Sequence, residues 1–343
     1  MDRGFLMKII KNLITLIVTL GWCLFFNYHF VQAEGMPVTV QLQLPANNKS
    51  TGVVNLDVQP QQTVNFAVLL RNSSSNSVKI QIAPGVAKTN ENGAIFLGDS
   101  SRKGMDSSWH YHLRDLGFHS QTVTVAPQST KKIPVQLTIP KYQGSISGSI
   151  IVRPIVSRQA QETNQIQQAY GVLLNVGHYD QLSPKISLGP LQVRSQGGHS
   201  VTIGPIHNQR PIYYGNGALD YRGQIINSKH QPITKVHLSQ AALAANSILP
   251  LTLDWGEQPI KAGNYLFKAQ VREGQHYWQF KRHFTITNQQ AVKLNQKNLN
   301  LKPDHRPLII TLIAIALVAI ALFFWLVFWY AKNKGAVKAS KNR

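Results

Sequence analysis

Apolar side chains recur at every second position in many short stretches of this chain. In residues 54–72 (VNLDVQPQQTVNFAVLLRN), an apolar pair precedes a Pro-Gln-Gln turn, and four alternating apolar residues follow it: Val64, Phe66, Val68 and Leu70. A strand with one buried face has this period of two, and proline ends a strand and sets the turn. We predict a scaffold hairpin whose apolar row packs into a core.

The same pattern returns 67 residues later. Residues 58–70 and 125–137 both read V-x-P-Q-x-T-x-x-[FI]-x-V-x-L, and apolar and polar residues also alternate over residues 78–82. Short alternating strands with a turn signal about every ten residues indicate an antiparallel β-sandwich.

A second group of strands follows a Gln- and Ser-rich stretch. Its clearest part is residues 260–287 (IKAGNYLFKAQVREGQHYWQFKRHFTIT), which predict a strand, a turn at 272–275 and a return strand. The apolar positions are Tyr265, Phe267, Ala269, Val271, Trp278, Phe280, Phe284 and Ile286. A Gly-x-Tyr sequence at the start of such a strand is common in immunoglobulin-like sandwiches, where the tyrosine hydroxyl closes a corner.

The predicted fold class is therefore all-β, with two tandem immunoglobulin-like β-sandwiches and one C-terminal transmembrane helix. We place the sandwiches at residues 36–158 and 166–300. Residues 169–176 (AYGVLLNV) fit two roles: the last strand of the first sandwich, paired with residues 149–155, or the first strand of the second. Sandwiches of this size can bury a core without disulfides, and the only cysteine, Cys23, lies before both.

Both ends of the chain carry targeting signals. Residues 1–33 combine a basic start, an apolar run and a Val-Gln-Ala cleavage site, as a secretory signal peptide does. Residues 308–330 form an uncharged apolar run of 23 residues, long enough for a membrane-spanning helix, and the basic tail 331–343 follows. Because basic residues stay on the cytoplasmic side, we expect a single-pass cell-membrane protein whose outer region, 34–307, faces the cell wall.

The outer region is strongly basic. The chain has 35 Lys and Arg and 14 Asp and Glu. Removing the three basic residues and one acid of the signal peptide, and the five basic residues of the tail, leaves 27 basic and 13 acidic residues, a net charge of +14. Such a surface attracts polyanions, and outside a cell anionic wall polymers and acidic proteins are better candidates than nucleic acid.

Candidate catalytic and metal sites are weak. Gly144–Gly148 lacks the central serine of a nucleophile elbow, and its glycines indicate a bend or a close backbone approach. His110 and His112 alternate in the sequence, but no carboxylate or cysteine set completes a metal site. The close carboxylate pair, Asp254 and Glu257, is predicted to be two exposed acids of a turn. We therefore expect no enzyme activity, metal or cofactor.

One cluster suits a ligand. Trp109, Tyr111 and Arg114 combine aromatic rings, which stack on sugars, with a guanidinium, which pairs with carboxylates or phosphates. These three are our candidate ligand-binding residues. The alternative role for Trp109 and Tyr111 is to cap the edge of the core.

The order of the weaker motifs resembles one family. The first region contributes residues 56–72, 89–95 (TNENGAI), 123–140 and 144–150; the second contributes 185–188, 245–247, 261–265 and 277–287. This order, with the terminal helix, resembles the WxL-interacting proteins of Gram-positive bacteria. The chain departs from that pattern at Gly148-Ser149, where the family has two glycines, and at Ala245-Asn246-Ser247, which lacks a proline. We expect both to be loop changes that alter a binding surface and leave the sandwiches intact.

The resemblance implies a non-catalytic surface adaptor. Its first domain would bind peptidoglycan, and its second would bind host extracellular proteins, as in adhesion, or other partners. The protein would assemble with WxL-domain proteins. The chain has no Trp-x-Leu sequence after the predicted signal peptide, which contains Trp22-Cys23-Leu24, so it would be the membrane-held partner of a WxL protein. Two alternatives stay open: a membrane-tethered cell-wall hydrolase or an accessory to one, and a structural spacer.

Overall fold

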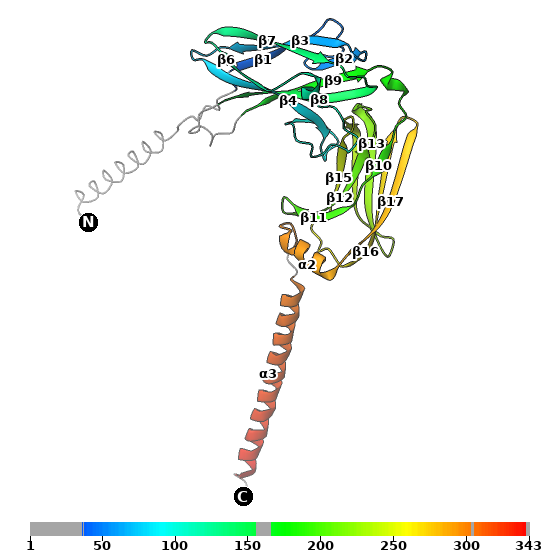
Figure 1. The fold of residues 1–343 in the computed structure, drawn as a ribbon. Helices are drawn as coiled ribbons and strands as arrows, with labels where there is room; N and C mark the ends of the chain where they lie inside the picture. The colour runs from blue at the N-terminus through cyan, green and yellow to red at the C-terminus, as the bar shows by residue number, and fades with distance from the viewer. Residues whose placement is uncertain (1–35, 37, 156–165, 303–304, 341–343) are drawn as a thin grey trace, which may run out of the picture. The chain divides into compact units, whose positions relative to one another are not determined.

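The computed structural model describes residues 36, 38–155, 166–302 and 305–340, so the predicted signal peptide lies outside the described residues. Contacts divide the chain into two compact units (Figure 1). Unit 1 comprises residues up to 87, 97–103 and 110–182; unit 2 comprises 88–96, 104–109 and 183 onward.

Unit 1 is a sandwich of two β-sheets. One sheet has the strand order β1-β3-β7, and the other has the order β2-β9-β8-β4-β5, with β6 also paired to β4. The strands are β1 (Val38–Gln43), β2 (Val54–Val58), β3 (Thr63–Asn72), β4 (Val78–Thr89), β5 (Ile95–Gly98), β6 (Gln121–Val125), β7 (Ser129–Thr138), β8 (Gly144–Pro154) and β9 (Gln168–Val176). A short 3₁₀ helix, η1 (Leu113–Leu116), precedes β6.

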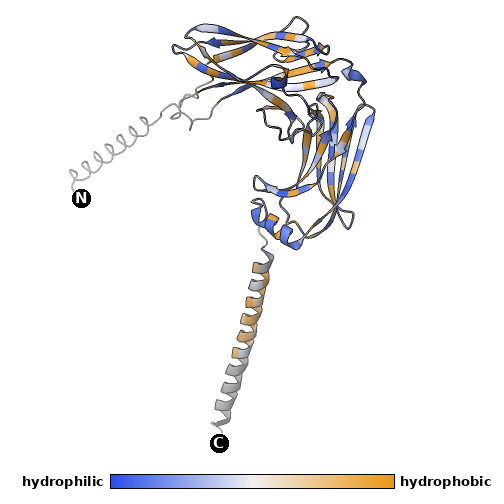
Figure 2. Ribbon diagram, viewed as in Figure 1, coloured by the Kyte–Doolittle hydropathy of each residue, from blue (hydrophilic) through white to orange (hydrophobic). Residues whose placement is uncertain are grey.

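The alternating residues of the sequence form the core of unit 1. Val68 and Leu70 from one sheet and Ile80, Val152 and Leu174 from the other are all fully buried in one cluster. Figure 2 shows the matching alternation of hydrophilic and hydrophobic positions along the strands. The all-β sandwich prediction is confirmed.

The hairpin prediction for residues 54–72 is wrong. Strand β2 pairs with β9 and strand β3 pairs with β1 and β7, so the Pro-Gln-Gln turn carries the chain from one sheet to the other. Pro60 is followed by Gln61 at φ 66°, and Gln62 N–H donates to Gln59 O at 3.2 Å. Proline followed by a residue of positive φ is the signature of a type II turn.

The second copy of the repeat makes the same crossing. Strand β6 pairs with β4, whereas β7 pairs with β3, and Gln128, the counterpart of Gln61, has a φ of 49°. The repeat therefore encodes a sheet-crossing turn, and both of its apolar rows face one core from opposite sheets.

Glycine at position 148 reflects a close approach. Gly148 lies in β8, and a Cβ there would lie 2.6 Å from Leu113 Cγ and 2.9 Å from Leu113 Cδ1. Only a residue without a side chain lets η1 pack this closely on β8, as the sequence led us to expect.

The two roles left open for residues 169–176 are distinguished by strand pairing. Strand β9 pairs antiparallel with β8 from Val152↔Gln168 to Gly144↔Val176, which makes it part of unit 1. Unit 1 therefore extends to residue 182, beyond the predicted limit at 158, and the residues added include those of β9 that we had placed in the second sandwich.

Unit 2 is a second sandwich. One sheet has the order β10-β12-β11, with β15 also paired to β12, and the other has the order β14-β13-β16-β17. The strands are β10 (Ile186–Leu188), β11 (Gln192–Gln196), β12 (His199–Asn208), β13 (Tyr214–Asn227), β14 (Pro232–Leu243), β15 (Ile248–Asp254), β16 (Gly263–Glu273) and β17 (His276–Ile286). A 3₁₀ turn (Tyr179–Gln181) precedes β10 in the chain, and helix α2 (Asn288–Lys297) follows β17.

The late hairpin of the sequence is confirmed. Strands β16 and β17 pair directly from Gly263↔Ile286 to Glu273↔His276, and the predicted row of β16, including Phe267 and Val271, is buried. The Tyr265 hydroxyl donates to the backbone oxygen of Lys261 at 2.6 Å. The predicted tyrosine corner is therefore present.

Two segments from the first half of the sequence belong to unit 2. Thr89 Oγ1 lies 3.0 Å from Ser247 Oγ and accepts a hydrogen bond from Ala244 N–H at 2.9 Å, and all three residues are buried. In residues 104–109, Gly104 O accepts a hydrogen bond from the backbone N–H of Ile248 at 2.9 Å. The TNENGAI and Ala-Asn-Ser motifs, weak as separate signals, thus meet in one buried network.

The last element is one long helix, α3 (Arg306–Ser340). The segment Leu308–Val327 is long and apolar enough to cross a membrane, and none of its residues is buried. Figure 2 shows this part of α3 mostly in orange, the colour of hydrophobic residues.

Candidate ligand surfaces of the two units

The structure places the three predicted ligand-binding residues in different settings. Trp109 belongs to unit 2, whereas Tyr111 and Arg114 belong to unit 1. Tyr111 is half-buried against the core, and its ring meets that of Tyr142 edge-on at 5.0 Å. The exposed Arg114 side chain lies 3.7 Å from Asp115 Oδ1. Tyr111 thus has the core-edge packing considered as its alternative role, and Arg114 is open to solvent.

His112 has a structural role. Its Nδ1 accepts the backbone N–H of Arg114 at 3.1 Å, and Asp115 Oδ2 accepts the N–H of His112 at 2.9 Å, which closes a capping box on η1. Burial lowers the pKa of this imidazole, helped by the nearby Arg114 charge. Within the described residues no group of three or more His, Cys, Asp or Glu could hold a metal ion.

The candidate catalytic acids each contact a base. Asp254 Oδ2 lies 2.7 Å from His199 Nδ1, and Asp254 Oδ1 accepts Gly256 N–H at 2.8 Å. Glu257 forms an ion pair with Lys302. A glycosidase acid needs burial to raise its pKa, and both carboxylates are about half exposed.

Unit 1 carries a shallow polar hollow of about 440 Å³ between the end of η1 and strand β7. His119, Gln121 and Gln136 line it, together with Phe118 and Pro134. Imidazole and amide groups can both donate and accept hydrogen bonds, so this hollow suits a hydroxyl-rich glycan.

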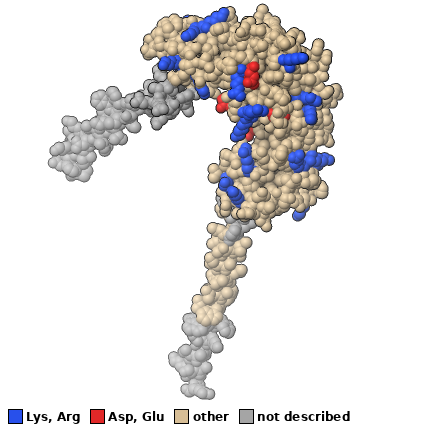
Figure 3. Space-filling view, in the orientation of Figure 1, with Lys and Arg blue, Asp and Glu red and all other residues tan. Residues whose placement is uncertain are grey.

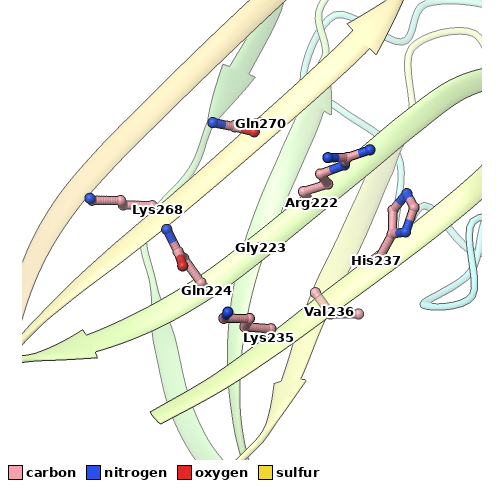
Figure 4. A pocket seen from close by; sticks show the side chains of 8 residues that line it. All are labelled: Arg222, Gly223, Gln224, Lys235, Val236, His237, Lys268 and Gln270. Carbon is pink, nitrogen blue, oxygen red and sulfur yellow. The ribbon is translucent and has the colours of Figure 1, made fainter. Parts of the chain in front are cut away.

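Unit 2 carries a larger hollow of about 520 Å³ on the outer face of the β14-β13-β16-β17 sheet. Figure 4 shows side chains from three neighbouring strands along it, among them Arg222 and Gln224 on β13, Lys235 on β14 and Lys268 on β16. Most of the side chains that line it are basic or carry amides, and His237 and Val236 complete the lining.

Asp220, beside that hollow, interacts with two basic neighbours. It pairs with Arg222 Nε at 3.1 Å and with His237 Nε2 at 2.5 Å. Partial burial acts to raise the pKa of Asp220, but the hydrogen bonds from these neighbours outweigh it, so that the pKa is lowered. Figure 3 shows basic side chains spread over the molecular face in view and acidic ones at only a few places.

The sequence reasoning did not identify this basic face. Lys268 and Gln270 were visible as the outward positions of the predicted strand 265–271, but polar outward positions occur in every solvated strand. Only the strand pairing brings Lys235 of β14 into the same row.

Comparison with known proteins gives two family matches. Residues 38–153 match the model described as "WxL Interacting Protein, peptidoglycan binding domain". Residues 157–296 match "WxL Interacting Protein, host binding domain". Together they span most of the chain in the expected order. The comparison with curated proteins returned no match.

Solved structures with low similarity include three of the chaperone or PapD-like type. The class 5 fimbriae chaperone CfaA is 10% identical, with a TM-score of 0.29 over 66% of this chain and 95% of its own. The E. coli chaperone DraB is 10% identical, with a TM-score of 0.27 over 71% and 98%. The PapD-like domain of human CEP192 is 12% identical, with a TM-score of 0.23 over 44% and 94%.

Proposed function

Because the chain belongs to the WxL-interacting protein family, we propose that it is a membrane-anchored, non-catalytic adaptor of the cell surface. In this proposal unit 1 holds peptidoglycan, unit 2 holds a WxL-domain protein or a host extracellular protein, and α3 anchors both. The observation that carries the proposal is the order of the two binding-domain families ahead of a membrane-length apolar helix.

Several features support the anchoring. The basic tail 331–343 follows the apolar helix, and basic residues stay on the cytoplasmic side. The signal-peptide sequence at residues 1–33 would export the region between the two. The proposed division into a signal peptide, two binding domains, a helix and a tail follows from these features together.

Within unit 1 the glycan is assigned to the hollow lined by His119, Gln121 and Gln136. Its amides and imidazole line the hollow together with the exposed Pro134. Glycan recognition uses such hydrogen-bonding groups beside apolar contact surface. Arg114 is the charged candidate for the peptide carboxylates of the wall.

A sedimentation assay tests the proposal. The full chain in detergent is mixed with purified peptidoglycan sacculi stripped of phosphate-containing polymers, at about 0.15 M ionic strength. We expect saturable co-sedimentation without release of soluble fragments, weakened by the change Gln121→Ala with Gln136→Ala. The control change Gln41→Ala with Gln43→Ala alters β1, which does not line the hollow.

Three results would overturn parts of this proposal. Release of soluble wall fragments would indicate the hydrolase alternative, and the change Asp254→Asn with Glu257→Gln would then test the acids directly. No binding to stripped sacculi would remove the peptidoglycan assignment. Binding that the hollow variant and the control weaken equally would place the glycan elsewhere on the chain.

A further inference from the structure

The outer face of the β14-β13-β16-β17 sheet is a basic surface with a regular layout. Along β16 the odd-numbered side chains, such as Phe267 and Val271, are buried in the core of unit 2, so Lys268 and Gln270 project from the other side. Strand β13 does the same, with Tyr221 and Ile225 buried and Arg222 and Gln224 outward.

Strand register aligns these outward residues into rows. One row runs Lys235–Gln224–Lys268–Lys281 across the four strands, because Gln224 pairs with Lys235 and with Lys268, and Lys268 pairs with Lys281. The next row runs His237–Arg222–Gln270–Gln279. Neighbouring strands lie about 4.8 Å apart, so each row extends roughly 14 Å across the sheet.

The row Lys235–Gln224–Lys268–Lys281, here called the lysine row, forms no ion pair with a described acidic residue. None of its three lysines has an ion pair with any of the residues that the structure describes. Asp220 is the nearby carboxylate of the face, and Arg222 and His237 already hold it. Lys268 and Lys281 lie directly opposite each other, an arrangement that destabilises a sheet when no anion is present.

The composition of the face favours a polyanion over a folded protein. The centres of protein–protein interfaces are enriched in aromatic residues and depleted of lysine, whereas the two rows contain three lysines, one arginine, one histidine and three glutamines. Lysine binds phosphate as a point charge. The glutamine amides between the charges can bond the hydroxyl groups of a polyol.

We propose that this sheet face binds a linear phosphodiester polymer of the cell wall, a chain of polyols joined through phosphates. Successive phosphates lie along the lysine row, and the hydroxyl groups of the polyols meet Gln224, Gln270 and Gln279. The inference goes beyond the proposed function, which assigns wall binding to unit 1. It gives unit 2 a second, electrostatic hold on the wall.

The test compares two variants with the same loss of charge. The face variant is Lys235→Gln, Lys268→Gln and Lys281→Gln. The control variant is Lys261→Gln, Lys293→Gln and Lys297→Gln, three exposed lysines of unit 2 outside the sheet face. Binding of the full chain in detergent to poly(glycerol phosphate) is measured across a salt series, with tryptophan-monitored unfolding as the check that unit 2 is intact.

We expect the face variant to bind roughly tenfold or more weakly at low salt. The negative slope of log affinity against log salt should become shallower by about 2, as the loss of three phosphate contacts predicts. At about 0.15 M salt the control variant should stay within about twofold of the parent, because the Debye length of about 8 Å screens charges that lie away from the face. Both variants should bind polymer-stripped sacculi as the parent does, which separates this result from the peptidoglycan assignment.

Three outcomes would overturn the inference. Equal losses in both variants would mean that net charge alone attracts the polymer. An unchanged face variant would place the polymer elsewhere. Tighter binding of the parent to poly-glutamate than to poly(glycerol phosphate), lost in the face variant, would mean that the face serves an acidic polypeptide.

Discussion

The two sheets of unit 2 approach closely at Gly204 and Phe267, and mutation can test this contact. A Cβ added to Gly204 on β12 would lie 2.2 Å from Cζ of Phe267 on β16, in the opposite sheet. Ordinary carbon–carbon contacts are about 3.5–4.0 Å, so Gly204→Ala creates an overlap of more than 1 Å by that measure. The Phe267 ring is fully buried.

The expected energies follow from this geometry. Overpacking costs about 1–3 kcal/mol, and an overlap of this size belongs at the upper end. Phe267→Leu removes about three carbons and costs about 2 kcal/mol. If the two changes acted independently, the double variant would lose about 5 kcal/mol; because leucine vacates the space that the new methyl needs, we expect a loss of only about 2–3 kcal/mol.

Tryptophan fluorescence monitors the unfolding of unit 2. Of the six tryptophans, Trp109, Trp255 and Trp278 belong to unit 2, and the other three lie in residues 1–33 or in α3. At about 2–4 °C per kcal/mol, Gly204→Ala should lower the unfolding temperature by roughly 6–12 °C, and adding Phe267→Leu should restore part of it. A double variant less stable than both single variants, by the sum of their losses, would refute the contact.

Three further changes test local features. Tyr265→Phe removes the hydroxyl donor to Lys261 O and should cost about 1 kcal/mol in urea unfolding; no loss would mean that water replaces this bond fully. Gln61→Val should destabilise unit 1 by about 1–2 kcal/mol in calorimetry because its φ is 66°, whereas Gln61→Gly should be nearly neutral, and equal effects would contradict a left-handed turn. The folded-state pKa of His112 is lowered from 6.5, so the unfolded chain binds this proton first and the stability of unit 1 falls as pH drops below about 6.5. The variant His112→Asn keeps a capping acceptor and should lose less stability than the parent between about pH 7.5 and 5.5. An identical decline in the two proteins would show that His112 does not contribute.

The alternation of the sequence predicted the strands well, because a period of two follows from one buried face. It could not predict which sheet a strand joins. Val58 and Val64 both face the core of unit 1, yet one lies in β2 and the other in β3, in opposite sheets. A hairpin and a sheet-crossing turn give the same apolar pattern, and the difference lies in the backbone angle at Gln61.

The basic face of unit 2 could not be predicted from the sequence for a related reason. Lys235 and Lys281 are 46 residues apart, and they enter one row only through the register of β14, β13, β16 and β17. A shift of one residue in any of these pairs would send the side chain to the core. The opposite case is the predicted ligand cluster of Trp109, Tyr111 and Arg114. These residues are close in the sequence, yet the structure divides them between two units.

The two departures from the family pattern bear on the interior. Ser149 lies in β8 and is fully buried, and its hydroxyl donates to Gly98 O at 3.1 Å. Asn246 is almost fully buried at a φ of 50°, which asparagine tolerates, and its side chain donates to Ser108 Oγ at 2.8 Å. The expectation of a loop change is therefore wrong for Ser149, which lies in a strand, whereas Asn246 does lie in the turn between β14 and β15. Both side chains are buried, so neither departure itself changes an exposed face of its unit.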